Sequence, residues 1–132
     1  MKRTVSSLMS RDVCTIRMDE SLAAVEQRLG DRRLSWAPVL EGPGTVIGVI
    51  SVADLLRLRT QGGDAQAARA WQMCSYKPLT VQADSDLAEV AREMVERHVH
   101  HVVVADRGAV VGVLSSLDFV REFARLLKET PA

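Results

Sequence analysis

Hydrophobic positions follow the same order of patterns in the two halves of this sequence. The first half predicts a strand over 13–16, a helix from Asp19 to Gly30, strands over 36–40 and 46–50, and a helix from Ser51 to Arg59. The second half predicts a strand over 78–81, a helix capped by Asp84 or Ser85, strands over 101–104 and 110–114, and a helix from about Ser116 past Leu127. Each half therefore reads strand, helix, strand, strand, helix, which is an α+β pattern.

Individual positions sharpen these predictions. The helix after Asp84 carries the clearest apolar stripe in the chain, with Val95 at its end. Gly30 is expected to stop the first helix, as glycines do just past a helix end. The alanine-rich stretch 65–73 predicts an extra helix with Trp71 and Met73 turned inward. Pro38 should lie at a strand start or on a sheet edge, because proline cannot donate to a ladder.

One seven-residue motif occurs twice, where a predicted strand runs into a predicted helix. The copies are Gly48-Val49-Ile50-Ser51-Val52-Ala53-Asp54 and Gly112-Val113-Leu114-Ser115-Ser116-Leu117-Asp118, 64 residues apart. A serine at a helix start can cap a backbone N–H, and an acidic residue three positions later can reach back to the N–H of that serine. The same groups suit a ligand, because helix starts attract phosphate and a carboxylate accepts from paired hydroxyls. Both interpretations, cap alone or ligand site, remain open at this point.

Charge and composition exclude several classes of function. The chain has 17 basic and 17 acidic residues and few aromatic ones, which argues against a nucleic-acid or membrane-surface protein. We expect no signal peptide and no membrane span, because no long apolar run occurs. Cys14 and Cys74 lack metal or disulfide spacing and are expected to be reduced thiols of a cytoplasmic protein. With no nucleophile–base pair and no phosphate-binding glycine loop, we predict that the chain is not an enzyme.

The two motifs in this five-element order resemble the cystathionine-β-synthase (CBS) domain, and two such domains in tandem resemble a stand-alone Bateman module. The resemblance covers 5–127. It implies two β-α-β-β-α repeats, over 5–58 and 67–129 with a linker at 59–66, packed with pseudo-twofold symmetry into one compact module. It also implies two clefts between the repeats. The sequence departs from the family pattern at Val103, where a proline is common, so the two clefts are expected to differ and one could stay empty.

The family's usual ligands contain adenosine, so the resemblance implies AMP, ADP, ATP or S-adenosylmethionine as a regulatory ligand. No cofactor is implied, and Mg²⁺ would enter only with ATP. Carried over position by position, the ribose and phosphate contacts fall to Ser51 with Asp54 and to Ser115 with Asp118. The adenine walls fall to Val13, Thr15, Ala37 and Pro38 in one half, and to Pro78, Thr80, Val102 and Val103 in the other. Lys77, Arg57 and Arg121 flank motif elements and are candidate phosphate partners, and a solvated helix face is the other interpretation of the arginines.

The resemblance further implies a homodimer and a regulated effector protein that the residues do not identify. The alternative function is a ligand-free structural adaptor or dimerisation module that regulates a partner through its helices. His98, His100 and His101 form the last cluster of chemical interest. No cysteine or carboxylate follows them at ligand spacing, so the sequence predicts no metal site, and a contact with a ligand phosphate is the other interpretation.

Overall fold

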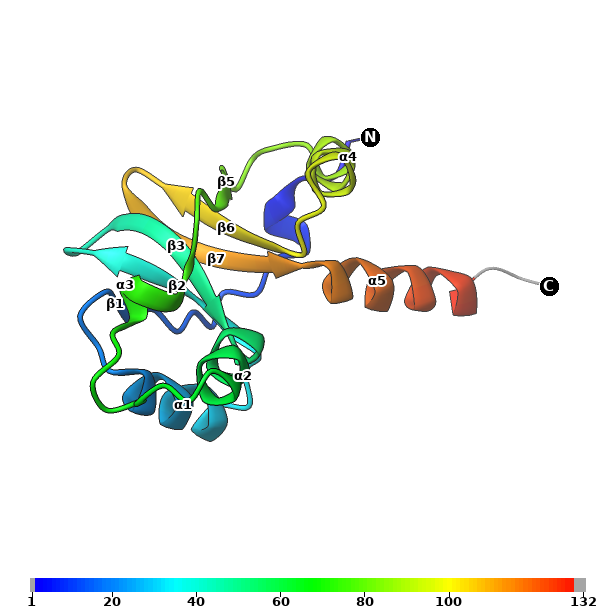
Figure 1. Cartoon of the computed structure of the whole chain (residues 1–132). Helices are drawn as coiled ribbons and strands as arrows, with labels where there is room; N and C mark the ends of the chain where they lie inside the picture. The colour runs from blue at the N-terminus through cyan, green and yellow to red at the C-terminus, as the bar shows by residue number, and fades with distance from the viewer. Residues whose placement is uncertain (1, 130–132) are drawn as a thin grey trace. The chain divides into compact units, whose positions relative to one another are not determined.

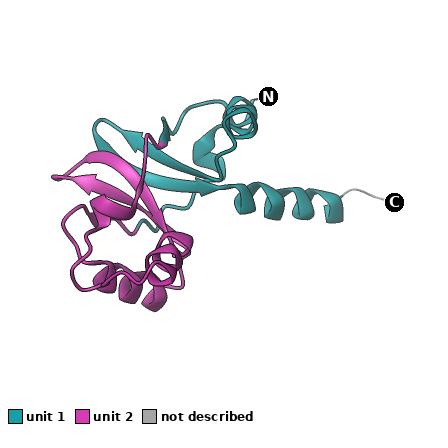
Figure 2. Cartoon of the chain, viewed as in Figure 1, with its two compact units in different colours: residues 1–13, 79–132 teal, residues 14–78 magenta. Residues whose placement is uncertain are grey.

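The computed structural model describes residues 2–129, which form two compact units. Unit 2 is Cys14–Pro78, and unit 1 combines residues 2–13 with residues 79–129 (Figure 2). The N-terminal segment therefore packs with the second repeat, although it precedes the first in the sequence. The two packing units do not coincide with the two sequence repeats. The repeat boundaries expected from the sequence therefore stay a prediction. In the described part of the chain, no helix is long and apolar enough to cross a membrane.

Unit 2 is built on a four-stranded sheet in the order β1-β2-β3-β4 (Figure 1). Its elements are β1 (Ile16–Arg17), α1 (Leu22–Asp31), β2 (Trp36–Glu41), β3 (Thr45–Ser51), α2 (Val52–Thr60), α3 (Ala70–Met73) and β4 (Ser75–Tyr76). β1 pairs with β2 in parallel, and β2, β3 and β4 pair antiparallel. Its core is aliphatic, with Ile16, Leu22, Val25, Leu29, Val39 and Ile50 almost fully buried.

Unit 1 repeats this arrangement on a three-stranded sheet in the order β5-β6-β7. Its elements are the 3₁₀ turn η1 (Val5–Ser7), β5 (Leu79–Val81), α4 (Leu87–Arg97), β6 (His101–Asp106), β7 (Ala109–Ser115) and α5 (Ser116–Glu129). β5 pairs with β6 in parallel and β6 with β7 antiparallel. Both hairpins shift register at the same place, between Val39 and Leu40 and between Val104 and Ala105. The α+β fold of two β-α-β-β-α repeats is thus confirmed.

The N-terminal segment packs against unit 1 in the same way as the segment after α2 packs against unit 2. Leu87 donates its N–H to Arg3, just as Leu22 donates to Ala68. Ser10 exchanges backbone hydrogen bonds of 2.8 and 3.0 Å with Val113 of β7, the place that β4 takes beside β3. Each motif strand therefore gains a neighbour from a segment outside the five-element repeat.

Several local predictions were wrong, and tertiary contacts explain them. Gly30 lies inside α1, which ends at Asp31, and Ser21 rather than Asp19 caps that helix. The first strand is only Ile16–Arg17, because β2 offers it just two paired residues. In the second half of the chain, Asp86 occupies the N-cap position of α4 without a capping side-chain hydrogen bond, and the 65–73 helix is reduced to α3. Trp71 is 43% exposed and Val95 is 74% exposed.

Pro38 occupies the third position of β2, yet it breaks no ladder. β1 pairs with β2 only from Val39 onwards, so at Pro38 the strand has a single neighbour, β3. At this position β2 is therefore an edge strand, as expected for a residue without an N–H, although β2 is a central strand from Val39 onwards.

Candidate functional site

The two motif serines and aspartates form matching hydrogen-bonded pairs at helix starts. At α2, the backbone N–H and the Oγ of Ser51 donate to Oδ2 of Asp54, at 2.8 and 3.1 Å. At α5, the same two groups of Ser115 donate to Oδ2 of Asp118, at 2.7 and 3.1 Å. The capping box predicted from the sequence is confirmed at α2, and α5 shows the same geometry, with the N–H of Asp118 3.4 Å from Oγ of Ser115.

An arginine one turn later faces the second oxygen of each carboxylate. Nη2 of Arg57 lies 3.2 Å from Oδ1 of Asp54, and Nη1 of Arg121 lies 3.8 Å from Oδ1 of Asp118. A carboxylate accepts about four hydrogen bonds. Since Oδ2 accepts two and Oδ1 meets only the arginine, each aspartate keeps acceptor capacity on Oδ1 after capping its helix.

The glycine of each motif allows a neighbouring segment to approach the strand. A Cβ at Gly48 would lie 2.4 Å from the carbonyl oxygen of Ser75 and 3.0 Å from Sγ of Cys74. A Cβ at Gly112 would lie 2.5 Å from Sδ of Met9. These flanking segments were missed in the sequence analysis, although two glycines inside apolar strands signal a close backbone approach.

Cys74 belongs to the surroundings of Asp54. Burial raises the pKa of its thiol first of all, a hydrogen bond with Tyr76 lowers it, and the negative charge of Asp54 raises it further. Arg57 adds a second link, because its Nη2 donates to the carbonyl oxygen of Met73 at 3.1 Å. The end of α3 and the start of β4 are therefore part of the environment of the first motif.

The predicted adenine walls fall into two groups. Ala37 and Pro38 on β2 and Val102 and Val103 on β6 are buried, main chain included, so a ligand reaches them only after a rearrangement. The more accessible group comprises Val13, Thr15 and Pro78, which are half-buried, and Thr80, which is exposed, and Lys77 beside this wall is also exposed. Val13 lies in unit 1, whereas Thr15, Lys77 and Pro78 lie in unit 2. Lys77 adopts a left-handed backbone, with φ 61°.

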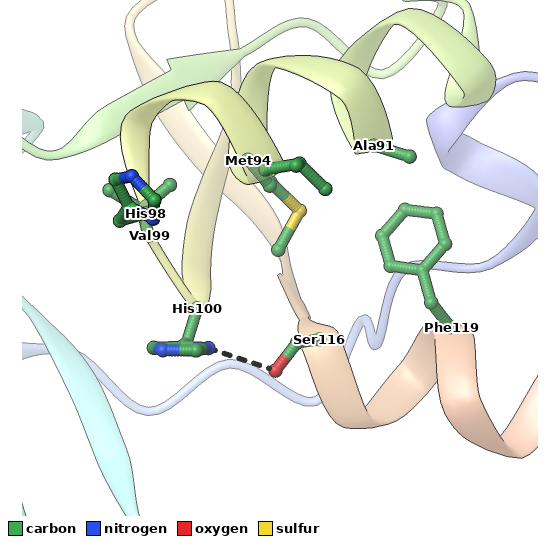
Figure 3. A pocket seen from close by; sticks show the side chains of 8 residues that line it. Ala91, Met94, His98, Val99, His100, Ser116 and Phe119 are labelled. Atoms are coloured by element: carbon green, nitrogen blue, oxygen red, sulfur yellow. Dashed lines mark hydrogen bonds between the residues drawn. The ribbon is translucent and has the colours of Figure 1, made fainter.

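A cavity of about 420 Å³ lies in unit 1 between the end of α4 and the start of α5. Met94, Val99 and Phe119 give it apolar walls, and His98 and His100 lie at one side, with Nδ1 of His100 3.4 Å from Oγ of Ser116 (Figure 3). Among the described residues, no three histidine, cysteine or acidic side chains gather as metal ligands would. His98 and His100 therefore belong to an apolar hollow beside the second motif.

Comparisons with known proteins agree with this architecture. A sequence model described as the CBS domain matches residues 5–60 and 70–125. Arabinose 5-phosphate isomerase KpsF from Escherichia coli O6:H1 is 28% identical over 115 residues, which are 86% of this chain and 35% of that protein. The chain thus spans about a third of the length of the curated relatives it first matches. The pig 5′-AMP-activated protein kinase subunit gamma-3 is 30% identical over 69% of this chain and 19% of its own length.

Among solved structures, the CBS domain pair of protein MJ0100 superimposes with a TM-score of 0.85 at 20% identity, covering 96% of this chain and 99% of that one. That pair was crystallised with 5′-methylthioadenosine and S-adenosyl-L-methionine. Two complete domain matches, two equivalent sheets and two copies of the Gly-x-x-Ser-x-x-Asp motif identify this chain as a member of the CBS-domain family, with a tandem pair of CBS domains.

Proposed function

We propose that this chain is a regulatory module that binds an adenosine-containing ligand, either AMP, ADP, ATP or S-adenosylmethionine, and carries out no catalysis. The observation that carries the proposal is the pair of helix-start carboxylates, each held by its serine and each with acceptor capacity left on Oδ1. The two ligands of the MJ0100 complex and the AMP-activated kinase subunit among the relatives support the choice of adenosine.

The chemistry of binding follows from these groups. The vicinal hydroxyls of a ribose are two donors, and an ionised carboxylate fixed on a helix start is a matching acceptor. The hydroxyl groups of Ser51 and Ser115 donate hydrogen bonds to the aspartates, and each Oγ can still accept a hydrogen bond from a ligand N–H or O–H. The first N–H groups of α2 and α5 lie beside these serines and favour a ligand phosphate. The adenine walls named from the sequence remain part of this proposal.

We propose that the module is a homodimer and that α5 forms its self-association surface. No residue of α5 that the structure describes is buried, and its exposed apolar side chains are Leu117, Val120, Phe123, Leu126 and Leu127. Figure 1 shows α5 continuing outward from the end of β7. A lone helix of 14 residues is marginal in water, so this apolar face needs a partner.

The charges of α5 do not oppose a second copy of the same helix. Glu122 and Glu129 pair with Arg125 of the same helix. The chain has no net charge, so two copies do not repel each other over longer distances.

This face also supports the alternative function, a ligand-free adaptor that dimerises and regulates an effector protein through its helices. In that case the carboxylates at Asp54 and Asp118 only cap their helices. Cys14 and Cys74 are free thiols, which fits the reducing cytoplasm proposed for either function.

Binding to nucleotide-free protein separates the two functions. The protein is purified, unfolded and refolded to remove retained ligand, and then tested by thermal shift and calorimetry with AMP, ADP, ATP and S-adenosylmethionine. A ligand at one hundred times its Kd adds about 2.7 kcal/mol to the stability of the folded state. We expect such a shift with at least one of the four, and its loss when Asp54→Asn and Asp118→Asn are combined. If the thermal shift does not saturate with ligand concentration and is the same in the wild type and the double variant, the adaptor function is the one supported.

A further inference from the structure

The two motif carboxylates differ in how open they are to a ligand. The side chain of Asp54 is 8% exposed, whereas that of Asp118 is 22% exposed. Both hold the same helix-start hydrogen bonds to their serines, so capping does not cause the difference. The two sites also differ at the second oxygen, where the aspartate and its arginine are 3.2 Å apart in one repeat and 3.8 Å apart in the other.

Arg57 is held at two points. The same nitrogen, Nη2, lies 3.2 Å from Oδ1 of Asp54 and donates to the carbonyl oxygen of Met73 at 3.1 Å. Met73 is the last residue of α3, and the chain then continues into β4 beside the first motif strand. Arg57 thus ties the free oxygen of Asp54 to the backbone of the segment that covers it.

Arg121 forms a looser contact with Asp118. Its Nη1 lies 3.8 Å from Oδ1, outside hydrogen-bond distance, and its side chain is 70% exposed. An exposed, loose ion pair contributes little free energy, so a ligand displaces it easily. Arg57 is 51% exposed, but displacing it costs more, because it breaks a closer ion pair with a nearly buried carboxylate and a hydrogen bond to a main-chain carbonyl.

We infer that ligand binds through Asp118 and that Arg57 keeps Asp54 closed, so that the module has one open site per chain. This inference rests on the function proposed above. Arg57 is then a specificity-determining residue of the first repeat that acts by occupying its carboxylate. Asp54 serves the fold by capping α2, while Asp118 caps α5 and receives ribose hydroxyls.

The test is a calorimetric titration of the full chain with AMP, ADP, ATP and S-adenosylmethionine, each used separately. Wild type should bind one ligand per chain. Asp118→Asn should weaken binding by about tenfold or more, the effect of losing a charged hydrogen-bond acceptor. Arg57→Met keeps the apolar stem of the side chain and should raise the stoichiometry to two.

Two further variants make the result decisive. In Asp118→Asn combined with Arg57→Met, binding should return at a single site, now at Asp54. Arg59→Met is the matched control, because Arg59 is on the same helix but pairs with Glu26, and it should bind one ligand as wild type does. Circular dichroism confirms that each variant is folded, and Arg57→Gln replaces Arg57→Met if the latter unfolds.

The outcomes separate the two proposals. A wild-type chain that binds two ligands, an Asp118→Asn variant that binds normally, or a folded Arg57 variant that stays at one site would each overturn the inference while leaving adenosine binding in place. Failure of the wild type and every variant to bind any of the four probes would instead overturn the proposed function itself.

Discussion

Gly48 and Ser75 lie too close together for any side chain to fit between them. A Cβ on Gly48 would stand 2.4 Å from the carbonyl oxygen of Ser75, a main-chain atom held in the β3–β4 ladder. Since a backbone atom cannot move aside as a side-chain tip can, Gly48→Ala should destabilise the protein by about 2 kcal/mol or more. Urea unfolding followed by circular dichroism measures this.

Two other glycines provide the comparison. A Cβ at Gly112 would lie 2.5 Å from Sδ of Met9, in a flexible side chain, and 3.0 Å from the carbonyl oxygen of Ser10. Since the shortest contact is with a side chain, Gly112→Ala should cost less than Gly48→Ala. Gly30 lies inside α1, and a Cβ there would meet nothing within 4 Å. Gly30→Ala should therefore stabilise the protein by about 0.8 kcal/mol, the difference in helix propensity. Equal losses at Gly48 and Gly30 would contradict this account.

The helix-start serines should contribute to stability whether or not a ligand binds. Ser51→Ala and Ser115→Ala each remove a donor to the aspartate three residues later. We expect each to cost about 1 kcal/mol of unfolding free energy, the usual value of such a cap. Chemical denaturation of the ligand-free protein gives both values.

The two motif aspartates should contribute unequally to the stability of the folded state. Asp54→Asn disturbs a nearly buried carboxylate whose paired arginine is 3.2 Å away, whereas Asp118 is half-buried and its arginine is 3.8 Å away. Asp54→Asn should therefore destabilise the folded state more than Asp118→Asn does. The reverse order in ligand-free protein would contradict the structural role given to Asp54.

The elements and the motif geometry followed from the sequence because they depend on local spacing. A strand of alternating or continuous apolar residues and a serine with an acidic residue three positions later both act within a few residues. The hydrogen bonds from Ser51 to Asp54 and from Ser115 to Asp118 are of this kind.

The features that were missed depend on residues far apart in the chain. β4 exists only because Gly48 lets Ser75 and Tyr76 pair with β3. Val95 was placed on the buried stripe of α4, but helical spacing cannot reveal that the space beside it is a cavity and not a packed neighbour. Arg57 was seen as a candidate phosphate ligand, and only the fold shows that its guanidinium reaches both Asp54 and the carbonyl of Met73.

Self-association should depend on the apolar face of α5. Phe123 is 63% exposed near the middle of this face, so Phe123→Asp should leave the fold intact and shift a dimer to monomer at micromolar concentration. Analytical ultracentrifugation measures the shift. Leu56→Asp, on the exposed side of α2, is the matched control and should leave the dimer unchanged. If Leu56→Asp produces a monomer and Phe123→Asp does not, the dimer interface lies on α2 and not on α5.

The polar side of α5 should hold its structure through ion pairs. Arg125 hydrogen-bonds Glu122 and, at 2.6 Å, Glu129, and its contact keeps the pKa of the Glu122 carboxyl below its ordinary value of 4.5. A lowered pKa gives stability that is present above the ordinary value and is lost as the pH falls through the folded-state value. This helix should therefore lose stability on acidification, which circular dichroism measures as a loss of helix content.

Cys74 should make the stability of the protein sensitive to alkaline pH. Burial raises the pKa of its thiol above the ordinary value of 9.0, so the folded state keeps the proton longer than the unfolded chain does. The resulting stabilisation is complete below pH 9.0 and declines as the pH rises through the folded-state pKa. Urea midpoints measured from pH 8 to pH 10 should fall in wild type and fall less in Cys74→Ala.

Chemical modification tests the same thiol directly. In native Cys14→Ala protein at pH 8, iodoacetamide should alkylate Cys74 much more slowly than in urea, because the thiolate is scarce and the side chain is buried. Since Asp54 contributes to the raised pKa, Asp54→Asn should speed the native reaction, whereas Asp118→Asn should not. Equal acceleration by the two variants would mean that local unfolding, and not the charge of Asp54, controls the thiol.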